Sequence, residues 1–160
     1  MPVILLTLHA YGTWLPDRPQ GYVRRDTPGV LPSNTTQAER YRKQMHHPQA
    51  SFGQAEQHAI LTATINAAAL QNLELHAAAT DITHAHLLIS WRDDRPASHI
   101  QRSLKRSIST HLNTLHRRPW LSRGGHIQPI QDRAHLDHLR TAYLPKHTGL
   151  QYSPTQGIHP

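Results

Sequence analysis

The chain has 160 residues, the length of one ordinary domain (residues 1–160), and its 17 Lys and Arg exceed its 10 Asp and Glu. It contains no Cys, which excludes disulfides, thiolate metal ligands and thiol nucleophiles, so any metal must be held by His, carboxylate or amide oxygen. A sequence pI near 10.4 favours a polyanionic partner, most often nucleic acid, although a merely basic protein has the same balance.

The N-terminal sequence and the hydropathy argue against a membrane protein. The chain has no apolar run long enough to cross a bilayer, and "MPVILLTLHAYG" lacks the basic region and cleavage site of a signal peptide. We therefore expect no membrane partner and a cytoplasmic protein, nucleoid-associated when it is bound to DNA.

The first third of the chain predicts a strand, a long insertion and a helix. Residues 3–10, "VILLTLHA", form an apolar run of strand length. Residues 11–52 are crowded with Pro, Gly, Asp and Asn and predict a long irregular insertion, with a short helix at about residues 37–44. The alanine-rich residues 53–70 place Leu61, Ile65 and Ala68 at helical spacing.

The remainder predicts two strands, a helix, a strand and a last helix. Residues 73–91 indicate two strands joined by a tight turn around Asp81. Residues 97–118 carry an apolar stripe at helical spacing, made of Ile100, Leu104, Ile108, Leu112 and Leu115. After a Gly-Gly turn, residues 126–131 form a short strand, and a helix capped by Asp132 follows until Pro145 disturbs it. We expect the tail, residues 148–160, to be coil.

Without the insertion, this order is βαββαβ, the split βαβ pattern. It predicts an α+β fold: a ferredoxin-like sandwich in which an antiparallel sheet carries two helices on one face. The last helix lies outside that unit. The strand that contains "ITHAHLLIS" would then lie in the middle of the sheet.

That central strand carries two histidines with one residue between them. Because side chains of a strand alternate between faces, His84 and His86 point the same way, roughly 7 Å apart along the chain. Two nitrogens at that spacing can bind one metal ion, although 15 histidines make a chance pair equally plausible. His9 and His76, on neighbouring strands, either orient these ligands or have no role at the site, and the second interpretation is the simpler one.

Two further features fit chemistry on nucleic acid. The helix at residues 97–118 places Arg102, Lys105 and Arg106 opposite its apolar stripe, and the last helix carries Tyr143. A phenol with a pKa of about 10 is a poor nucleophile at neutral pH, but a divalent ion that polarises a scissile phosphate makes it competent. Histidine pair, basic helix and tyrosine together therefore fit tyrosine attack on a DNA phosphodiester, while each alone has an ordinary structural explanation.

Several motifs in order resemble one family. "HAHLLIS", with His84 and His86, follows the opening "LHAYGTWLPDRPQGYV"; Trp120, Gly124 and Gly125 precede the last strand; and "AYLPKH" places Tyr143 four residues before His147. Over residues 3–150 the sequence resembles the single-tyrosine HUH transposases, most of all the REP-associated tyrosine transposases and their insertion-sequence relatives. His147 stands where those proteins commonly have glutamine or asparagine.

The resemblance implies a function and a site. It implies a DNA transposase and endonuclease that nicks and rejoins hairpin-containing single-stranded DNA through a 5′-phosphotyrosine, as a monomer or homodimer. Tyr143 would be the nucleophile, and His84, His86 and His147 would hold Mg²⁺ or Mn²⁺, of which imidazole suits Mn²⁺ better. The residues expected to contact DNA are Arg102, Lys105 and Arg106, with Arg18, Arg24 and Arg25 of the insertion reading the hairpin or its flank.

Other functions and another nucleophile also fit parts of the sequence. A cupin needs a glutamate where Ser90 stands, and a metallo-β-lactamase-like hydrolase needs Asp and His where Leu88 and Ile89 stand, so both fail. A non-catalytic, domesticated single-stranded nucleic-acid binder, using the basic helix and exposed aromatic side chains, stays open. Tyr152 is a rival nucleophile, because we expect a mobile tail that can reach a cleft.

Overall fold

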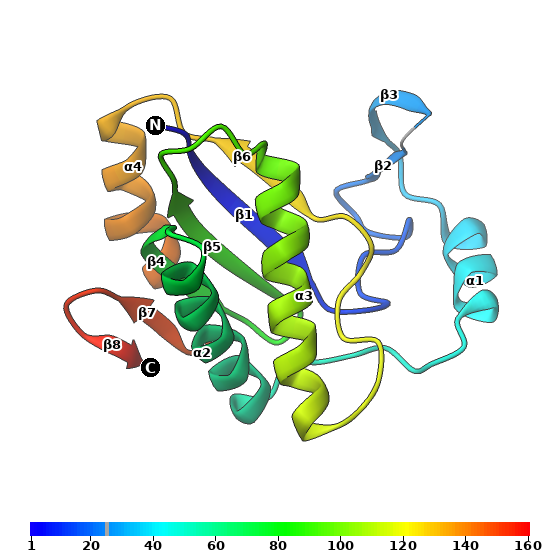
Figure 1. Cartoon of the computed structure of the whole chain (residues 1–160). Helices are drawn as coiled ribbons and strands as arrows, with labels where there is room; N and C mark the ends of the chain where they lie inside the picture. The colour runs from blue at the N-terminus through cyan, green and yellow to red at the C-terminus, as the bar shows by residue number, and fades with distance from the viewer. Residues whose placement is uncertain (25) are drawn as a thin grey trace.

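Six strands form one antiparallel sheet in a computed structural model that describes residues 1–24 and 26–160 (Figure 1). Their order is β6-β1-β5-β4-β7-β8: β6 His126–Pro129, β1 Val3–His9, β5 His84–Ser90, β4 Glu74–Thr80, β7 Gln151–Ser153 and β8 Gly157–His159. Over these described ranges, no helix is long and apolar enough to cross a membrane.

The expected ferredoxin-like α+β frame is confirmed. The four predicted strands lie in the order β6-β1-β5-β4, and each is antiparallel to its neighbours. Two helices, α2 (Gln54–Leu70) and α3 (Ala97–Leu115), pack side by side on one face of this sheet (Figure 1). The strand β5, which carries the histidine pair, lies in its interior, as predicted.

The two faces of β5 bury different residues. Ala85, Leu87 and Ile89 belong to the main core beneath α2 and α3, where Ile100 and Leu104 of α3 are fully buried. The alternate residues of β5 face the other way: Leu88 belongs to a second, smaller core. This arrangement explains the consecutive leucines, since a strand covered on both faces needs apolar side chains on each.

The last helix covers the face of the sheet opposite α2 and α3. It consists of α4 (Arg133–His138), a π-helical turn η1 (Leu139–Tyr143) and a 3₁₀ turn η2 (Leu144–Lys146). Asp132 caps it as predicted, since its carboxylate accepts a hydrogen bond from the His135 N–H at 2.8 Å. The helical path continues through Pro145 and ends one residue later, because a proline is tolerated in the first turn of η2.

The prediction that the tail is coil was wrong. Residues 151–159 form the hairpin β7–β8, and β7 pairs with the edge of β4 through Ala78↔Tyr152 and Ala79↔Gln151. Tyr152 packs against the main core, on the face covered by α2 and α3. Its ring is thus held on the side of the sheet that the histidine pair does not face.

The insertion at about residues 11–52 is more regular than expected. It contains a short hairpin, β2 (Tyr22–Arg24) and β3 (Thr27–Leu31), and the predicted helix as α1 (Thr35–Gln44), which extend to one side of the sheet (Figure 1). The helix begins at Thr35 because the Asn34 side chain accepts the Gln37 N–H at 2.9 Å. Arg25, one of the expected DNA-contacting residues, lies outside the described residues.

Candidate metal centre and cleft

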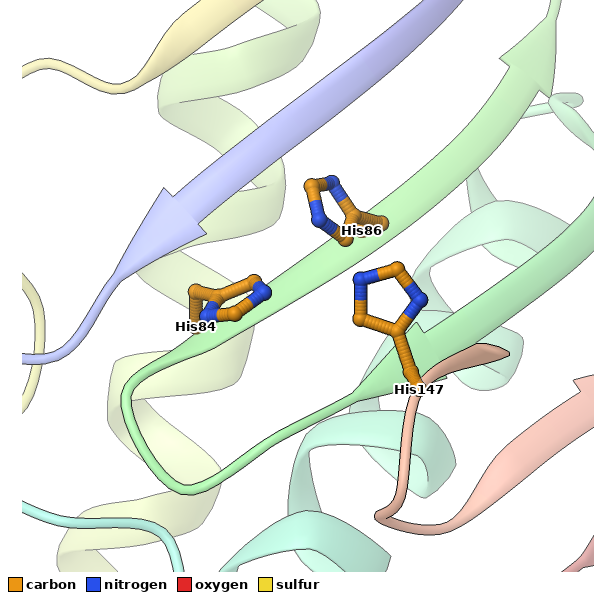
Figure 2. Close-up of side chains that lie close together, drawn as sticks. All are labelled: His84, His86 and His147. Carbon is orange, nitrogen blue, oxygen red and sulfur yellow. The ribbon is translucent and has the colours of Figure 1, made fainter. Parts of the chain in front are cut away.

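Three histidines converge beside the smaller core. Ligand atoms of His84, His86 and His147 all lie within 4.8 Å of one another, and the three rings point into a common space (Figure 2). The centroids of the His86 and His147 rings are 4.6 Å apart, and those of His84 and His86 are 4.9 Å apart. In the described part of the chain, no other group of three or more such side chains comes together in this way.

Strand register fixes two of these side chains. His84 and His86 lie on one face of β5, and across the antiparallel ladder they face His9 and Thr7 of β1. On the other side of β5, the residue opposite His86 is Ala79 of β4, which is fully buried. Its small side chain leaves room above the sheet, and His147 and Tyr143 use that room.

The third histidine is positioned by backbone contacts at the end of β4. The Gly149 N–H donates to the Thr80 carbonyl at 3.0 Å, and the Thr80 N–H donates to the Leu150 carbonyl at 3.0 Å. The buried Gln57 of α2 accepts the Leu150 N–H at 2.9 Å. A Cβ at residue 149 would lie 2.4 Å from the Thr80 carbonyl oxygen, so only glycine allows this approach, which brings His147 over the sheet.

Each of the three rings has its Nδ1 atom in a hydrogen bond. His147 Nδ1 lies 3.0 Å from the Leu144 carbonyl, which can only accept, so Nδ1 carries the proton and the neutral ring has its lone pair on Nε2. His86 Nδ1 lies 2.8 Å from the Thr7 hydroxyl, and His84 Nδ1 lies 3.1 Å from the Thr83 hydroxyl. Histidine ligands of metals are usually oriented by such a bond from the second ring nitrogen.

Burial keeps the two β5 histidines neutral. It lowers the pKa of His86 to about 3, with the charges of His147 and His84 adding to the effect. Burial followed by the charge of His147 also lowers the pKa of His84. A neutral imidazole offers a lone pair to a metal, whereas a protonated one has none, so these two rings are ready to bind at neutral pH.

The donor set and its spacing fit a divalent transition metal. Imidazole nitrogens bind such ions at about 2.1 Å, which places two ligand atoms on one ion no more than about 4.2 Å apart. The observed limit of 4.8 Å is slightly wider, so small ring rotations complete the site. Three protein ligands leave positions open for other oxygen atoms, as in catalytic rather than structural metal sites.

Tyr143 lies beside this cluster. The centroid of its ring is 5.5 Å from that of His86 and 5.4 Å from that of His147, edge to face, and 37% of the residue is exposed. The π turn η1 makes this possible: the Leu144 N–H donates to the Leu139 carbonyl, and both leucines are buried on the sheet five residues apart. An α-helix would not place both on one side, and π turns occur frequently at functional sites.

A cleft of about 1220 Å³ opens over the histidines. Its walls come from the ends of β1 and β5, the insertion, the Gly-Gly loop before β6 and η1. The lining residues are Thr7, His9, Thr13, Trp14, Arg18, Gln49, Thr83, His84, His86, Ser122, Arg123, Gly124, Gly125, His126 and Tyr143. Within the described residues, this lining includes two arginines and no carboxylate, so the cleft suits an anionic ligand.

A solved structure resembles the chain in overall shape. It is that of a REP-associated tyrosine transposase bound to a REP hairpin, with a sequence identity of 9% and a TM-score of 0.46. The match covers 90% of this chain and 70% of that one. No protein-family model and no curated protein matches the sequence.

The three basic residues of α3 differ in their surroundings. Arg102 and Arg106 are exposed, and Arg102 Nε donates to the Ser98 carbonyl at 3.3 Å. Lys105 is directed to the Gly-Gly loop, where its amine donates to the carbonyls of Ser122 and Gly124 at 2.6 and 2.7 Å. Burial lowers the pKa of Lys105. Lys105 therefore holds one wall of the cleft.

The two described arginines of the insertion also differ. Arg18 lines the cleft, with its guanidinium carbon 3.6 Å from the centroid of the Trp14 ring. Arg24 lies on β2, pairs with Asp26 at 3.1 Å and is exposed. The hydroxyls of Tyr22 and Tyr41 both bond to the Gln37 side chain, which keeps these two tyrosines within the insertion.

Several residues that line the cleft were not predicted from the sequence. His9 was expected to have no role at the site, yet it lies in the cleft, its ring centroid 6.4 Å from that of His84, and burial, with the charge of His84, lowers its pKa to about 4. The strand order itself could have found it, because the end of β1 must meet the start of β5 in an antiparallel pair. Thr7 and Arg123 gave no separate signal in the sequence.

Proposed function

We propose that this protein is a metal-dependent DNA transposase and endonuclease that nicks and rejoins single-stranded DNA through a phosphotyrosine at Tyr143. The observation that supports this most is the convergence of Tyr143 with three histidines, of which His84 and His86 line with it a cleft whose described lining has no carboxylate. An anionic backbone can enter such a cleft without repulsion. The motif resemblance described above adds hairpin-containing DNA as the substrate.

His84, His86 and His147 would hold the ion, with Nε2 as the ligand atom of each ring. When bound, Mn²⁺ or Mg²⁺ supplies Lewis-acid polarisation of the scissile phosphate and offsets charge on its oxygens. The donor set favours Mn²⁺, since imidazole is a better ligand for it than for Mg²⁺. The hydroxyls of Thr7 and Thr83 orient the rings of His86 and His84, and the Leu144 carbonyl holds His147 in the tautomer with its lone pair on Nε2.

The proposed reaction conserves the energy of the phosphodiester bond. The Tyr143 oxygen attacks phosphorus, the bond from phosphorus to the 3′ oxygen breaks, and a 5′-phosphotyrosine and a free 3′ hydroxyl result. The phenolic proton passes to water, which reaches the half-exposed tyrosine. Attack by a 3′ hydroxyl on the phosphotyrosine reverses the step and rejoins strands without a nucleotide cofactor.

The basic residues outside the metal cluster are proposed to bind the DNA backbone. Arg102 and Arg106 form an exposed basic face on α3, with Lys105 beneath it at the loop, and Arg24 lies on β2 of the insertion. Arg25, outside the described residues, is proposed for the same role. Such contacts supply affinity and position rather than sequence choice. The protein would act as a monomer or homodimer.

The second candidate is a non-catalytic binder of single-stranded nucleic acid. It shares the basic cleft and the exposed Trp14, but it has no use for a tyrosine beside three clustered histidines. The two functions differ in one observable, which is whether a bound strand is cut when a divalent ion is present.

A nicking assay separates the two functions. The substrate is a pool of single-stranded DNAs, each an imperfect hairpin flanked by randomised sequence, incubated with Mn²⁺, Mg²⁺ or EDTA. We expect cleavage with either ion, none in EDTA, and none for His86→Ala, while His138→Ala, on the exposed side of α4, keeps wild-type cleavage. Binding without cleavage under every condition, or full cleavage in EDTA, contradicts the enzyme.

A further inference from the structure

The cleft contains a stack of three side chains that ends in a guanidinium. The ring of His9, at the end of β1, lies 4.0 Å from the ring of Trp14, measured between centroids, with an interplanar angle of 34°. The guanidinium carbon of Arg18 lies 3.6 Å from the centroid of the same indole. All three line the cleft, and His9 faces the metal-cluster residue His84 across the β1–β5 ladder.

The stack fixes the guanidinium and leaves its donors available. A guanidinium that stacks on an aromatic ring contacts the ring with its flat face. Its N–H groups lie in the plane of the guanidinium and remain free to bind an anion. Arg18 forms no salt bridge with any residue that the structure describes, although Arg24, Arg42 and Arg95 each pair with a nearby aspartate. Burial lowers the pKa of Arg18. A fixed cation without a counter-ion marks an anion site.

A second arginine lies on a wall of the same cleft that is held in place. Lys105 binds the carbonyls of Ser122 and Gly124, which flank Arg123 in the chain. The next residue, Gly125, has φ +129°, and a Cβ there would lie 2.7 Å from the Thr7 carbonyl oxygen, so the loop presses against β1. The cleft thus presents two arginines, one from the insertion and one from this loop, beside the histidine cluster.

We propose that Arg18 binds a backbone phosphate of the single strand in the cleft, next to the metal cluster, and that Trp14 and His9 are positioning residues that hold its guanidinium. Arg123 contacts the strand from the loop. This assignment rests on the proposed function, and it distinguishes Arg18, which lines the cleft, from the exposed Arg24 on β2. A rigid, bidentate donor at this place would orient the phosphate chain before attack.

The test measures binding of a short, labelled oligothymidylate in EDTA at several salt concentrations. Each phosphate contact to a single strand contributes about 0.7 to the slope of log affinity against log salt. Arg18→Met should lower the slope by about 0.7 and the affinity roughly tenfold or more. The control, Arg92→Met, removes one exposed charge at the far end of β5 and should leave slope and affinity unchanged.

The positioning role has its own variants. Trp14 is 45% exposed, so Trp14→Leu should leave the melting temperature unchanged while it weakens oligothymidylate binding, and Trp14→Phe should restore most of the affinity. Trp91 and Trp120 are only 2% and 5% exposed, so quenching of tryptophan emission by bound DNA reports on Trp14. Trp14→Leu binding like the wild type, or no quenching at saturating DNA, overturns this role.

The outcomes distinguish the two proposals. If the wild type forms a covalent DNA adduct while Arg18→Met keeps the wild-type slope and affinity, the Arg18 assignment is wrong and the proposed function stands. If Arg18→Met loses slope and affinity but no variant and no metal yields cleavage or adduct, the phosphate contact stands and the enzyme does not. If the wild type does not bind oligothymidylate in EDTA at any salt concentration, the Arg18 assignment is wrong.

Discussion

The three clustered histidines depend on small partners that fix their rings. His86 is 5% exposed and its Nδ1 atom lies 2.8 Å from the hydroxyl of Thr7, which is the residue opposite it on β1. Because Nδ1 is engaged in this hydrogen bond, Nε2 is the ring nitrogen left to bind a metal. A single hydroxyl on a neighbouring strand therefore orients the His86 ring for the proposed site.

Replacing that hydroxyl should weaken metal binding without removing a ligand. We expect Thr7→Val to lower Mn²⁺ affinity about 10–100-fold, the usual effect of losing a partner that orients a ligand, and Thr7→Ser to retain most of it. Isothermal titration calorimetry measures this. The control is Thr13→Val, since the Thr13 hydroxyl also lies in the cleft but donates to the Ala10 carbonyl and not to a histidine. Equal affinity for Thr7→Val and the wild type would contradict the role of Thr7.

The buried histidines also predict how stability depends on pH. Burial lowers the pKa of His86 from 6.5 to about 3, so between these values the unfolded chain binds a proton that the folded chain does not. The free energy of unfolding is therefore undiminished above pH 6.5 and falls as the pH decreases toward 3. For His86, the slope approaches about 1.4 kcal/mol per pH unit.

Urea unfolding of the metal-free protein at several pH values tests this dependence. His86→Asn should flatten the decline below pH 6.5, because asparagine does not titrate. The exposed His138→Asn serves as the control and should keep the wild-type decline. If His86→Asn and the wild type lose stability in parallel between pH 6.5 and 4, the histidine does not cause the decline.

At the scale of elements, one short segment carries both the tyrosine and the third histidine. From Leu139 to Leu150 the chain passes from a π turn to a 3₁₀ turn and then to the edge of β4. The helical part of this segment is anchored by the buried side chains of Leu139 and Leu144. Its end is held by the close contact and hydrogen bond between Gly149 and Thr80. The backbone position of His147 is thus set by packing on both sides of it, while the bond from Nδ1 to the Leu144 carbonyl orients its ring.

Gly149→Ala should displace His147 and weaken the metal site. The added methyl group would meet the Thr80 carbonyl at 2.4 Å and the Gln57 amide oxygen at 2.7 Å, so the segment must shift. We expect Mn²⁺ affinity, measured by calorimetry, to fall by roughly tenfold or more, as for other changes that misplace a ligand. In the control Gly53→Ala, the new methyl meets only the flexible end of Glu56. An unchanged affinity for Gly149→Ala would show that His147 is positioned otherwise.

The elements that sequence could predict are those with a strong period. The stripe of α3 and the apolar run of β5 predicted both elements, and the βαββαβ order predicted the sheet and the shared face of His84 and His86. The strands of the tail could not be predicted, because β7 and β8 have only three residues each and are ordered by the pairing of β7 with β4 and of β8 with β7. His147 was expected at the metal site through the motif resemblance alone, since a π turn and the close approach of Gly149 leave no periodic signal.

At the scale of the whole molecule, the main core and the proposed site lie on opposite faces of the sheet. The main core lies between β1, β4, β5 and the helices α2 and α3, while the cleft and the histidines lie on the opposite face. The formal net charge of +7 adds a general attraction for nucleic acid. Changes in the main core should therefore affect folding, and changes in the cleft should affect binding.

Leu104→Ala tests this separation. Leu104 is fully buried between α3 and the sheet, so its truncation should reduce the free energy of unfolding by about 2–5 kcal/mol. At a temperature where the variant is still folded, its Mn²⁺ affinity should equal that of the wild type, whereas Thr7→Val should show the reverse pattern. Chemical denaturation and calorimetry measure the two quantities. A large loss of metal affinity in folded Leu104→Ala would show that the two faces are coupled.

In the proposed reaction, Tyr143 becomes covalently joined to DNA. Tyr152 offers a matched comparison, since it is held on the opposite face of the sheet against the main core. The measurement is peptide mass spectrometry of protein incubated with Mn²⁺ and the pool of flanked hairpins, applied to the wild type, Tyr143→Phe and Tyr152→Phe. We predict a 5′-phosphonucleotide on Tyr143 in the wild type and in Tyr152→Phe, and no adduct in Tyr143→Phe, which still binds the DNA. An adduct that persists in Tyr143→Phe and disappears in Tyr152→Phe would contradict the proposed nucleophile.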